Sequence, residues 1–190
     1  MLENADKKEL LRLARNTLDT YLDRGSVPEY KTDRSVMIEK KGAFVSLHSE
    51  GELRGCIGQL DPDRKLYSVV QYCVLSAAFD DPRFAPVRRE ELDGLEIEIS
   101  VLTPFSRIRT ADEINVGKHG LYIVQGLYRG LLLPQVATEY GWDRDTFLRQ
   151  TCFKAGLPET AWKDPNTEIY TFEAEVFSES EFPVPDDSSR

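Results

Sequence analysis

Residues 42–60 read GAFVSLHSEGELRGCIGQL, and this stretch predicts a β-hairpin. The first arm alternates apolar and polar side chains, which is typical of a strand with one buried face. Glu50 and Gly51 would form the turn. The second arm contains LRGCIG, residues 53–58, in which two glycines enclose a thiol beside an arginine. Because each glycine weakens a strand, this pair requires a physical explanation.

The segments around the hairpin predict helices and further strands. Apolar residues at helical spacing predict helices at 6–24, 66–79 and 143–155, and a shorter helix that begins at Pro134. Alternating apolar and polar residues predict strands at 95–102 and 167–177. A second hairpin is predicted to turn near Gly126. Asp6 and Glu9 resemble a capping box at the start of the first helix. Hairpins and short connections favour antiparallel sheets with helices packed on one face, so the predicted fold class is α+β.

Composition limits the class of protein. The chain has 190 residues and a net charge of −9, which disfavours binding to phosphate backbones and anionic lipid surfaces. Cys56, Cys73 and Cys152 are far apart and form neither a disulfide framework nor a zinc-finger spacing. No run approaches the ~18 apolar residues of a membrane span. We therefore predict a reduced, cytoplasmic protein with no nucleic-acid or membrane partner.

The glycine pair of LRGCIG has two open interpretations. Gly55 and Gly58 could accommodate a bulge or a helix that lies close over the sheet. Alternatively, they could make room for a ligand at which Arg54 and Cys56 point, since residues two apart on a strand share a face. Leu53, Gly55 and Ile57 would then face the core.

The second interpretation gives Cys56 a chemical role. A guanidinium from Arg54 would lower the thiol pKa from its free value of about 8.5 and favour the thiolate, as in activated cysteine nucleophiles. His119, beside a glycine and before a strand, could serve as the base. Cys56 could equally be a small buried hydrophobic residue, and His119 a surface turn residue.

Other polar residues offer weaker signals. Glu96 and Glu98 share one face of a predicted strand, where paired carboxylates could perform acid–base chemistry or simply face solvent. Gln135, at a helix start, could present its amide to a ligand or to solvent. The two histidines and the scattered cysteines give no metal signature, so we predict neither a metal site nor a cofactor.

Several motifs together resemble one family. LRGCIG is similar to the signature hexapeptide of the AMMECR-domain family, named for the AMME syndrome chromosomal region, whose microbial members are called AmmeMemoRadiSam system protein A. The resemblance continues in the same order through DPRFAPV at 81–87, HGL at 119–121 and LLPQVA at 132–137. FLRQTCFKAGL and AWKDPNTEIYTFEAEVF resemble the microbial branch, so the similarity extends from the first helix to Phe177.

The resemblance implies a two-lobed α+β fold. A larger lobe would have an antiparallel sheet flanked by helices, a smaller lobe would hold a second sheet, and the hexapeptide would lie near the cleft between them. The domain would span residues 1–178, followed by a flexible tail at 179–190. The family also implies association with Memo-type and radical SAM proteins, but it specifies no reaction. A cysteine-dependent enzyme or substrate-handling subunit and a non-catalytic scaffold therefore both remain open.

Overall fold

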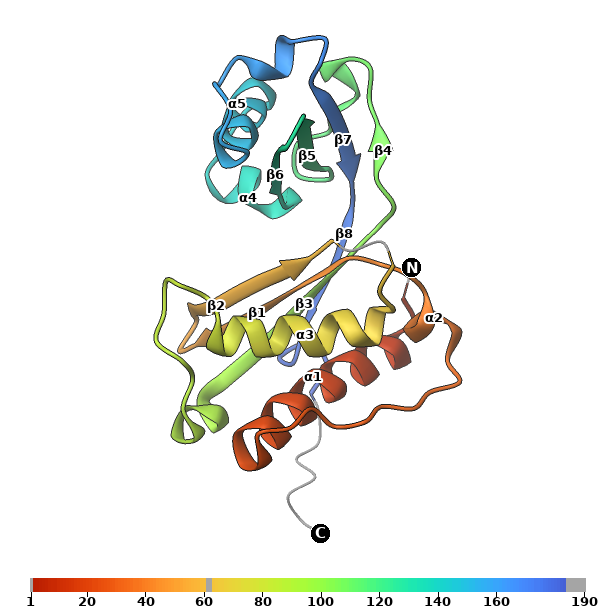
Figure 1. Ribbon diagram of the computed structural model, residues 1–190, viewed down its shortest axis with the longest axis vertical. Coiled ribbons are helices and arrows are strands. Elements are labelled where there is room, and N and C mark those ends of the chain that lie inside the picture. The colour runs from red at the N-terminus through yellow and green to blue at the C-terminus, as the bar shows by residue number, and fades with distance from the viewer. Residues whose placement is uncertain (1, 61–62, 184–190) are drawn as a thin grey trace. The chain divides into compact units, whose positions relative to one another are not determined.

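The computed structural model describes residues 2–60 and 63–183, and the chain folds into two compact units (Figure 1). The first unit comprises Met1–Val101 and Glu175–Arg190, and the second comprises Leu102–Ala174. The second unit is thus inserted into the first. Each unit combines helices with a four-stranded sheet, which confirms the predicted α+β class.

The first unit is built on a sheet in the order β2-β1-β3-β8. Its elements are α1 (Asn4–Arg24), α2 (Ser35–Ile38), β1 (Ala43–Ser49), β2 (Glu52–Gln59), α3 (Leu66–Phe79), the 3-10 helix η1 (Arg89–Gly94), β3 (Leu95–Leu102) and β8 (Ala174–Ser178). β1 pairs antiparallel with both β2 and β3. The predicted β1–β2 turn is confirmed: Glu50 and Gly51 have φ of 53° and 82°, as a tight hairpin of right-handed twist requires.

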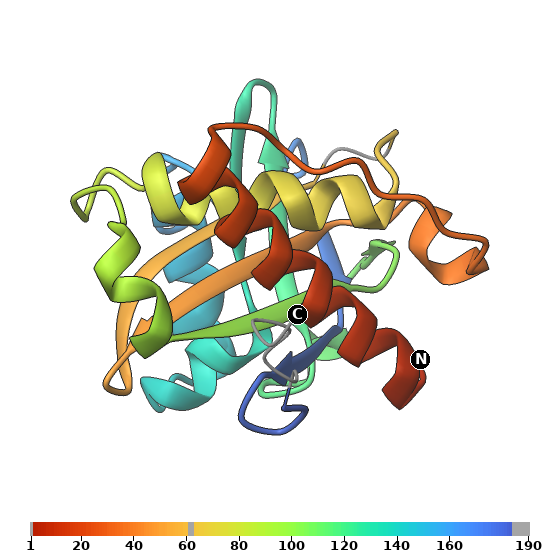
Figure 2. The ribbon, with the colours of Figure 1, turned by 90° about the horizontal axis from the view of Figure 1, so that it is seen from below.

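Helices α1 and α3 cover one face of this sheet (Figure 2). The apolar residues of the alternating strands, among them Val45, Leu47, Ile97 and Ile99, are fully buried against these helices. Each such side chain stabilises the fold by about 1.5–3 kcal/mol relative to an exposed position. The alternate positions leave a polar opposite face, and that face carries Cys56.

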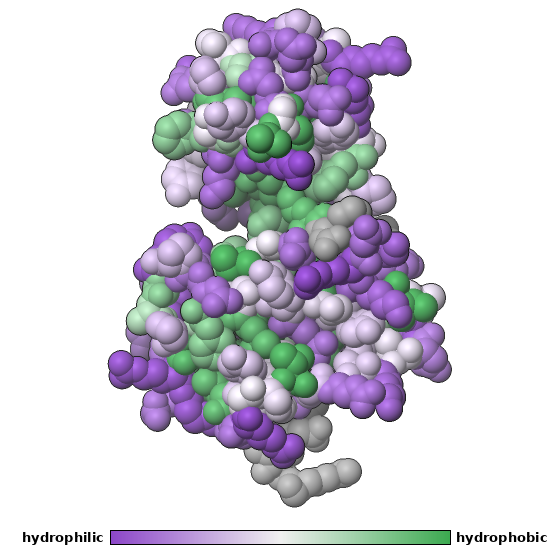
Figure 3. Space-filling model, in the orientation of Figure 1, coloured by the Kyte–Doolittle hydropathy of each residue, from purple (hydrophilic) through white to green (hydrophobic). Residues whose placement is uncertain are grey.

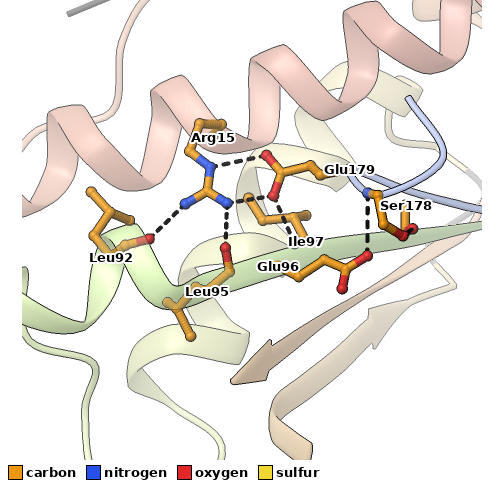
Figure 4. Close-up of polar contacts among 8 residues, drawn as sticks. Arg15, Leu92, Leu95, Glu96, Ile97, Ser178 and Glu179 are labelled. Atoms are coloured by element: carbon orange, nitrogen blue, oxygen red, sulfur yellow. Dashed lines mark hydrogen bonds and ion pairs between the residues drawn. The ribbon is translucent and has the colours of Figure 1, made fainter. Parts of the chain in front are cut away.

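Arg15 of α1 connects the helix to the two strands that flank the insertion (Figure 4). Its guanidinium donates to the carbonyl oxygens of Leu92 (2.9 Å) and Leu95 (2.7 Å) and forms an ion pair with Glu179, which follows β8. Glu179 in turn accepts a hydrogen bond of 2.9 Å from the backbone N–H of Ile97 on β3. One side chain therefore satisfies backbone and carboxylate groups from three elements.

Replacing Arg15 by methionine is expected to destabilise the first unit by about 2–3 kcal/mol, because it leaves the largely buried Glu179 carboxylate without its cation. The matched control is Arg12→Met on the same helix. Arg12 is 52% exposed and pairs with Glu9 on the same helix, so its loss should cost no more than about 0.5 kcal/mol. Urea unfolding followed by circular dichroism measures both variants, and equal losses would contradict this assignment.

The second unit has a sheet in the order β4-β7-β5-β6. Its elements are β4 (Ser106–Arg107), the 3-10 helix η2 (Ala111–Glu113), β5 (Gly120–Gln125), β6 (Tyr128–Leu132), α4 (Pro134–Glu139), α5 (Arg144–Lys154), the 3-10 helix η3 (Ala161–Lys163) and β7 (Glu168–Phe172). α5 packs on β5 and β6, with Phe147, Leu148 and Cys152 in the core. Pro134 occupies the first helical turn of α4 and Asp143 caps α5, both close to prediction.

Two expectations about element boundaries are wrong. The strand predicted at 167–177 is two strands, β7 and β8, which belong to different sheets and are separated at Glu173. The alternation of residues continues across the break, so the pattern carried no sign of it. The first helix begins earlier than predicted, because Glu3 and Asp6, rather than Asp6 and Glu9, form the capping box.

The described part of the predicted tail makes specific contacts. Glu179 binds Arg15, the backbone N–H of Ser180 donates to Glu96 (3.3 Å), and Phe182 packs against the core of the first unit. Residues 184–190 lie outside the described residues, so the expected flexibility there stays a prediction.

The surface of the first unit carries an apolar groove along α1 and α3. Figure 3 shows hydrophobic residues gathered over these helices, and the groove is lined by Tyr72, Leu75 and Phe79 among others. Among the described residues, no helix is long and apolar enough to cross a bilayer.

Candidate functional site

The hexapeptide lies in β2, which forms an edge of the first sheet. The pairing register shifts here: Leu47 lies opposite Gly55, but His48 lies opposite Leu53, so Arg54 is an extra residue in a β-bulge. The bulge places Leu53 level with His48, and Leu53 is 38% exposed. The expectation that Leu53 faces the core is therefore wrong, whereas Gly55 and Ile57 do face it.

Both glycines of the hexapeptide are closely packed against neighbouring residues. A Cβ at Gly55 would lie 2.1 Å from the carbonyl oxygen of Ala77 on α3, closer than any nonbonded contact allows. A Cβ at Gly58 would lie 2.2 Å from the ring of Phe44, which covers this glycine from the neighbouring strand. The structure thus favours the steric interpretation of the pair, and ligand binding by Gly55 and Gly58 stays a prediction.

The outer edge of β2 is closed by the segment that follows α3. The backbone N–H of Cys56 donates to the Asp81 carboxylate (2.9 Å), and the Arg83 guanidinium donates to the Cys56 carbonyl oxygen (3.4 Å). Arg83 also binds both carboxylate oxygens of Asp81, at 3.0 and 2.7 Å. This ion pair therefore takes the place of a neighbouring strand and holds Cys56 in position.

Electrostatics at Asp81 support this interpretation. The Asp81 side chain is only 2% exposed, and its hydrogen bonds from Arg83 hold the pKa of the carboxyl well below its usual range. The group is thus a buried anion that is fully paired in the folded chain.

Arg54 is held by a different carboxylate. Its Nε and Nη2 atoms donate to the two oxygens of Glu91 at 2.8 and 3.2 Å, and this ion pair lowers the pKa of Glu91. The third nitrogen, Nη1, is buried and has no hydrogen-bond partner within the described chain. Phe84 lies near both guanidinium groups, with its ring centroid 6.0 Å from Cζ of Arg54 and 5.3 Å from Cζ of Arg83.

The thiol of Cys56 is half-buried on the polar face of the sheet. Ser46, its cross-strand neighbour, donates a hydrogen bond of 3.3 Å from its hydroxyl to the sulfur. Burial raises the pKa of Cys56, and the Ser46 hydrogen bond and the positive charge of Arg83 offset this only in part. The expectation of a lowered pKa is therefore wrong, and the nearby cation is that of Arg83.

Glu98 extends this arrangement across the sheet. Ser46 pairs with Cys56 on β2 and with Glu98 on β3, so the three residues form one row on the polar face. The negative charge of Glu98 contributes to the raised pKa of Cys56. Thiol, hydroxyl and carboxylate thus occupy neighbouring positions across three strands.

The other predicted site residues belong to the second unit. His119 precedes β5, and its Nδ1 accepts a hydrogen bond of 3.2 Å from the backbone N–H of Asn115, which leaves Nε2 to carry the proton of the neutral ring. Gln135 lies in the first turn of α4. The pairing of His119 with Cys56 and the role of Gln135 stay predictions. Among residues 2–60 and 63–183, no three His, Cys, Asp or Glu side chains cluster as metal ligands do.

Sequence reasoning missed the residues that surround Cys56. Asp81, Arg83 and Phe84 lie 25 or more residues along the chain, and Ser46 was not singled out on its strand. One indication was present in the sequence: DPRF, residues 81–84, places a carboxylate and a guanidinium two residues apart just after a predicted helix. Such a segment can bind the free edge of a strand, but its target cannot be identified from spacing alone.

Comparison with known proteins identifies the family of the chain. The AMMECR1 family model matches residues 11–177. The chain belongs to the AMMECR1 family. A protein of Thermococcus gammatolerans is 46% identical over 185 residues, which cover 92% of this chain and 90% of that one. A protein of Methanothermobacter thermautotrophicus is 43% identical over 188 residues, or 94% and 96% of the two chains.

A solved structure has the same fold as this AMMECR1 protein. The crystal structure of uncharacterized protein PH0010 from Pyrococcus horikoshii superposes with a TM-score of 0.87 at 42% identity and covers 94% of this chain and 93% of that one. The family relationship therefore establishes the architecture around LRGCIG, and the chemistry of the site has to be argued from its residues.

Proposed function

We propose that this AMMECR1 protein handles an anionic substrate at the hexapeptide, with Arg54 binding the anion and Cys56 supplying a thiol. One observation carries the proposal: Nη1 of Arg54 is buried without a hydrogen-bond partner in the described chain, two residues from a half-buried thiol on the same strand.

The unpaired nitrogen is a reason to expect a ligand. A buried donor without an acceptor costs about 1–3 kcal/mol, and more when it is charged. Glu91 holds the other two nitrogens of Arg54, so the guanidinium is fixed before any ligand arrives. His48 Nε2 is likewise buried without a hydrogen-bond partner in the described chain, on the other arm of the hairpin. A carboxylate or phosphate would satisfy such donors.

The Cys56 thiol would carry its proton until the reaction begins. Because burial raises the pKa of Cys56, the sulfur carries its proton at neutral pH. Attack on a substrate would require transfer of that proton to a base as the new bond to sulfur forms. Glu98, across Ser46 in the same row, is one candidate base. His119 of the second unit is the other, but its Nδ1 would have to release the Asn115 N–H before it could accept a proton.

The family resemblance extends the proposal to partners. The resemblance described in the sequence analysis implies that such proteins act together with partner proteins. We propose that Memo-type and radical SAM proteins are these partners. Co-purification of each with the full chain, and its loss in Arg54→Gln, would test this extension.

Alkylation tests the state of Cys56 directly. We expect iodoacetamide to modify Cys56 slowly near neutral pH and progressively faster as the pH rises past the ordinary thiol pKa of about 8.5, because the reactive thiolate forms only there. Cys73 and Cys152 are internal controls: both are fully buried and should react only after unfolding. Mass mapping of the labelled peptides separates the three sites.

Two results would contradict the proposal. A Cys56 that stays unmodified in the folded chain at every pH would have no access to substrate. A Cys56 that reacts at full rate near pH 6 would be an activated thiolate, which contradicts the pKa direction given above.

A scaffold function is the second candidate, and the packing of Gly55 against α3 and of Gly58 against Phe44 favours it. In a scaffold, LRGCIG would serve only to build the fold, and Cys56→Ser would retain both fold and partner binding. In a substrate-handling protein, the same variant would fold but lose turnover when the partners and substrate are supplied. The serine variant is preferred to alanine because it keeps a polar group beside Ser46.

A further inference from the structure

A cavity in the second unit has no role in the site described above. It has a volume of about 650 Å³ and lies between two segments, 107–111 around η2 and 162–169 around η3 and β7. All of its lining residues belong to the second unit. Ligand pockets in proteins typically span about 300–1,000 Å³, so this volume suits a small organic molecule.

The cavity is cationic although the chain is strongly acidic. Arg107, Arg109 and Lys163 line it, against a single lining carboxylate, Asp164. That carboxylate already accepts hydrogen bonds from Gln125 Nε2 (3.2 Å) and from the backbone and side chain of Asn166 (2.8 and 3.0 Å). The Asp164 oxygens are therefore engaged by neighbouring protein donors. With three cations and one carboxylate, the lining of the cavity has a net positive charge.

Two acidic residues outside the cavity lining contact its arginines or their backbone. Glu113 accepts hydrogen bonds from the backbone N–H groups of Arg109 (2.8 Å) and Thr110 (3.0 Å), which lower its pKa. Glu168 pairs with Arg107 at 3.1 Å, but both side chains are well exposed, so an incoming anion could compete for this arginine.

An aromatic ring and apolar side chains complete the cavity. Trp162 lines it half-buried, with Lys163 Nζ 4.9 Å from the ring centroid. Ile108 and Ile169 line it as well and pack against the core of the second unit. Apolar and aromatic side chains together with a few polar or charged groups are the usual lining of a ligand pocket.

We propose that this cavity binds a phosphorylated small molecule that carries a planar ring, of the nucleoside monophosphate class. The phosphate is bound by Arg109, Lys163 and Arg107, whose positive charges attract its double negative charge. The ring packs against Trp162 and the neighbouring isoleucines. The proposal uses no residue of the hexapeptide site, so it stands or falls independently of the function proposed above.

Titration of the full chain with AMP tests the proposal. Binding is measured by calorimetry and by the indole N–H resonances of Trp142 and Trp162 in ¹⁵N–¹H spectra. We expect saturable binding that shifts the Trp162 resonance and leaves that of Trp142, which stacks on Tyr140 and does not line the cavity. Adenosine, which lacks the phosphate, should bind at least about 10-fold more weakly, and added inorganic phosphate should compete with AMP.

Variants locate the site. Arg109→Gln and Lys163→Gln should each weaken AMP binding by about 10-fold or more, and both residues are exposed, so neither change should affect folding. The matched control is Arg149→Gln on α5, an exposed arginine outside the cavity, which should leave the affinity unchanged.

Three results would overturn the proposal: no saturable binding of AMP at millimolar concentration, equal affinity for AMP in Arg109→Gln and Arg149→Gln, or equal affinity for AMP and adenosine. Inorganic phosphate that binds as tightly as AMP would overturn the role given to Trp162 and the planar ring.

Discussion

Replacing Gly55 by alanine is expected to destabilise the first unit by about 3 kcal/mol or more, which is among the largest effects of any single methyl group in this chain. The added Cβ would lie 2.1 Å from the Ala77 carbonyl oxygen and 3.1 Å from its carbonyl carbon. These are backbone atoms of α3, so no rotation of a side chain relieves the contact. Either the helix must move away from the sheet or β2 must leave its register.

Gly94→Ala and Gly58→Ala are the matched comparisons. A Cβ at Gly94 meets no atom of residues 2–60 and 63–183 within 4 Å, so this variant should lie within about 0.5 kcal/mol of the parent chain. At Gly58 the obstructing atoms belong to the ring of Phe44, a side chain that can rotate, so we expect an intermediate loss of about 1–2 kcal/mol.

The two units can be monitored separately in these experiments. Both tryptophans, Trp142 and Trp162, belong to the second unit, so their fluorescence reports on that unit alone. Hydrogen exchange of the β1 and β2 amides reports on the first. Gly55→Ala should accelerate exchange in β1 and β2 by roughly 100-fold, as expected for a loss of about 3 kcal/mol. Unchanged exchange in these strands would show that α3 tolerates the methyl group.

Replacing Asp81 by asparagine is expected to cost about 2–3 kcal/mol near pH 7. The amide can still accept the hydrogen bond from Cys56, but it loses the charge that pairs with Arg83 and turns an N–H₂ group toward the guanidinium. Loss of one partner from a buried ion pair usually costs about 3–5 kcal/mol, and the value is reduced here because Arg83 is 55% exposed.

The pH dependence of this loss follows from the direction of the pKa shift. The pKa of Asp81 is lower in the folded chain than its unfolded value of about 3.9, so the carboxylate stabilises the fold at pH values above that unfolded value. The contribution is lost as the pH falls through the folded pKa. The difference in free energy of unfolding between parent and Asp81→Asn should therefore be largest near neutral pH and shrink below about pH 4.

Urea unfolding at a series of pH values measures this difference, with Asp63→Asn as the control. Asp63 is 84% exposed and pairs with Lys40 on the surface, so its replacement should change stability by less than about 0.5 kcal/mol at any pH. A difference for Asp81→Asn that stays constant down to about pH 2 would show that the carboxylate does not titrate as assigned.

Local patterns predicted much of each unit. Three correctly predicted elements depend on signals within a short stretch of sequence. They are the hairpin turn at Glu50 and Gly51, where the glycine suits a positive φ, the helix α3 at 66–79 with its helical spacing, and the strand β3 at 95–102 with its strict alternation. The division of the strand at Glu173 escaped this reasoning because both halves alternate in the same way. Its cause is the pairing of β7 and β8 with different strands, which are distant in sequence.

The candidate site shows the same limit. The sequence singled out Cys56 and Arg54 as candidates, but it assigned the wrong guanidinium to the thiol, because adjacency along a strand says nothing about which carboxylate binds a given arginine. Glu91 binds Arg54, and Asp81 brings Arg83 to Cys56. The pKa of the Cys56 thiol is shifted upward mainly by burial, and the burial of one side chain depends on the whole fold.

The insertion of residues Leu102–Ala174 between β3 and β8 has a consequence for biosynthesis. A ribosome releases the first three strands of the N-terminal sheet long before it releases the fourth, and the whole inserted unit emerges in between. During that interval the outer edge of β3 has no partner strand and could pair with other nascent chains. Early folding of the insertion would shorten the effective distance between β3 and β8, so its folding rate should govern how much of the newly made chain escapes aggregation.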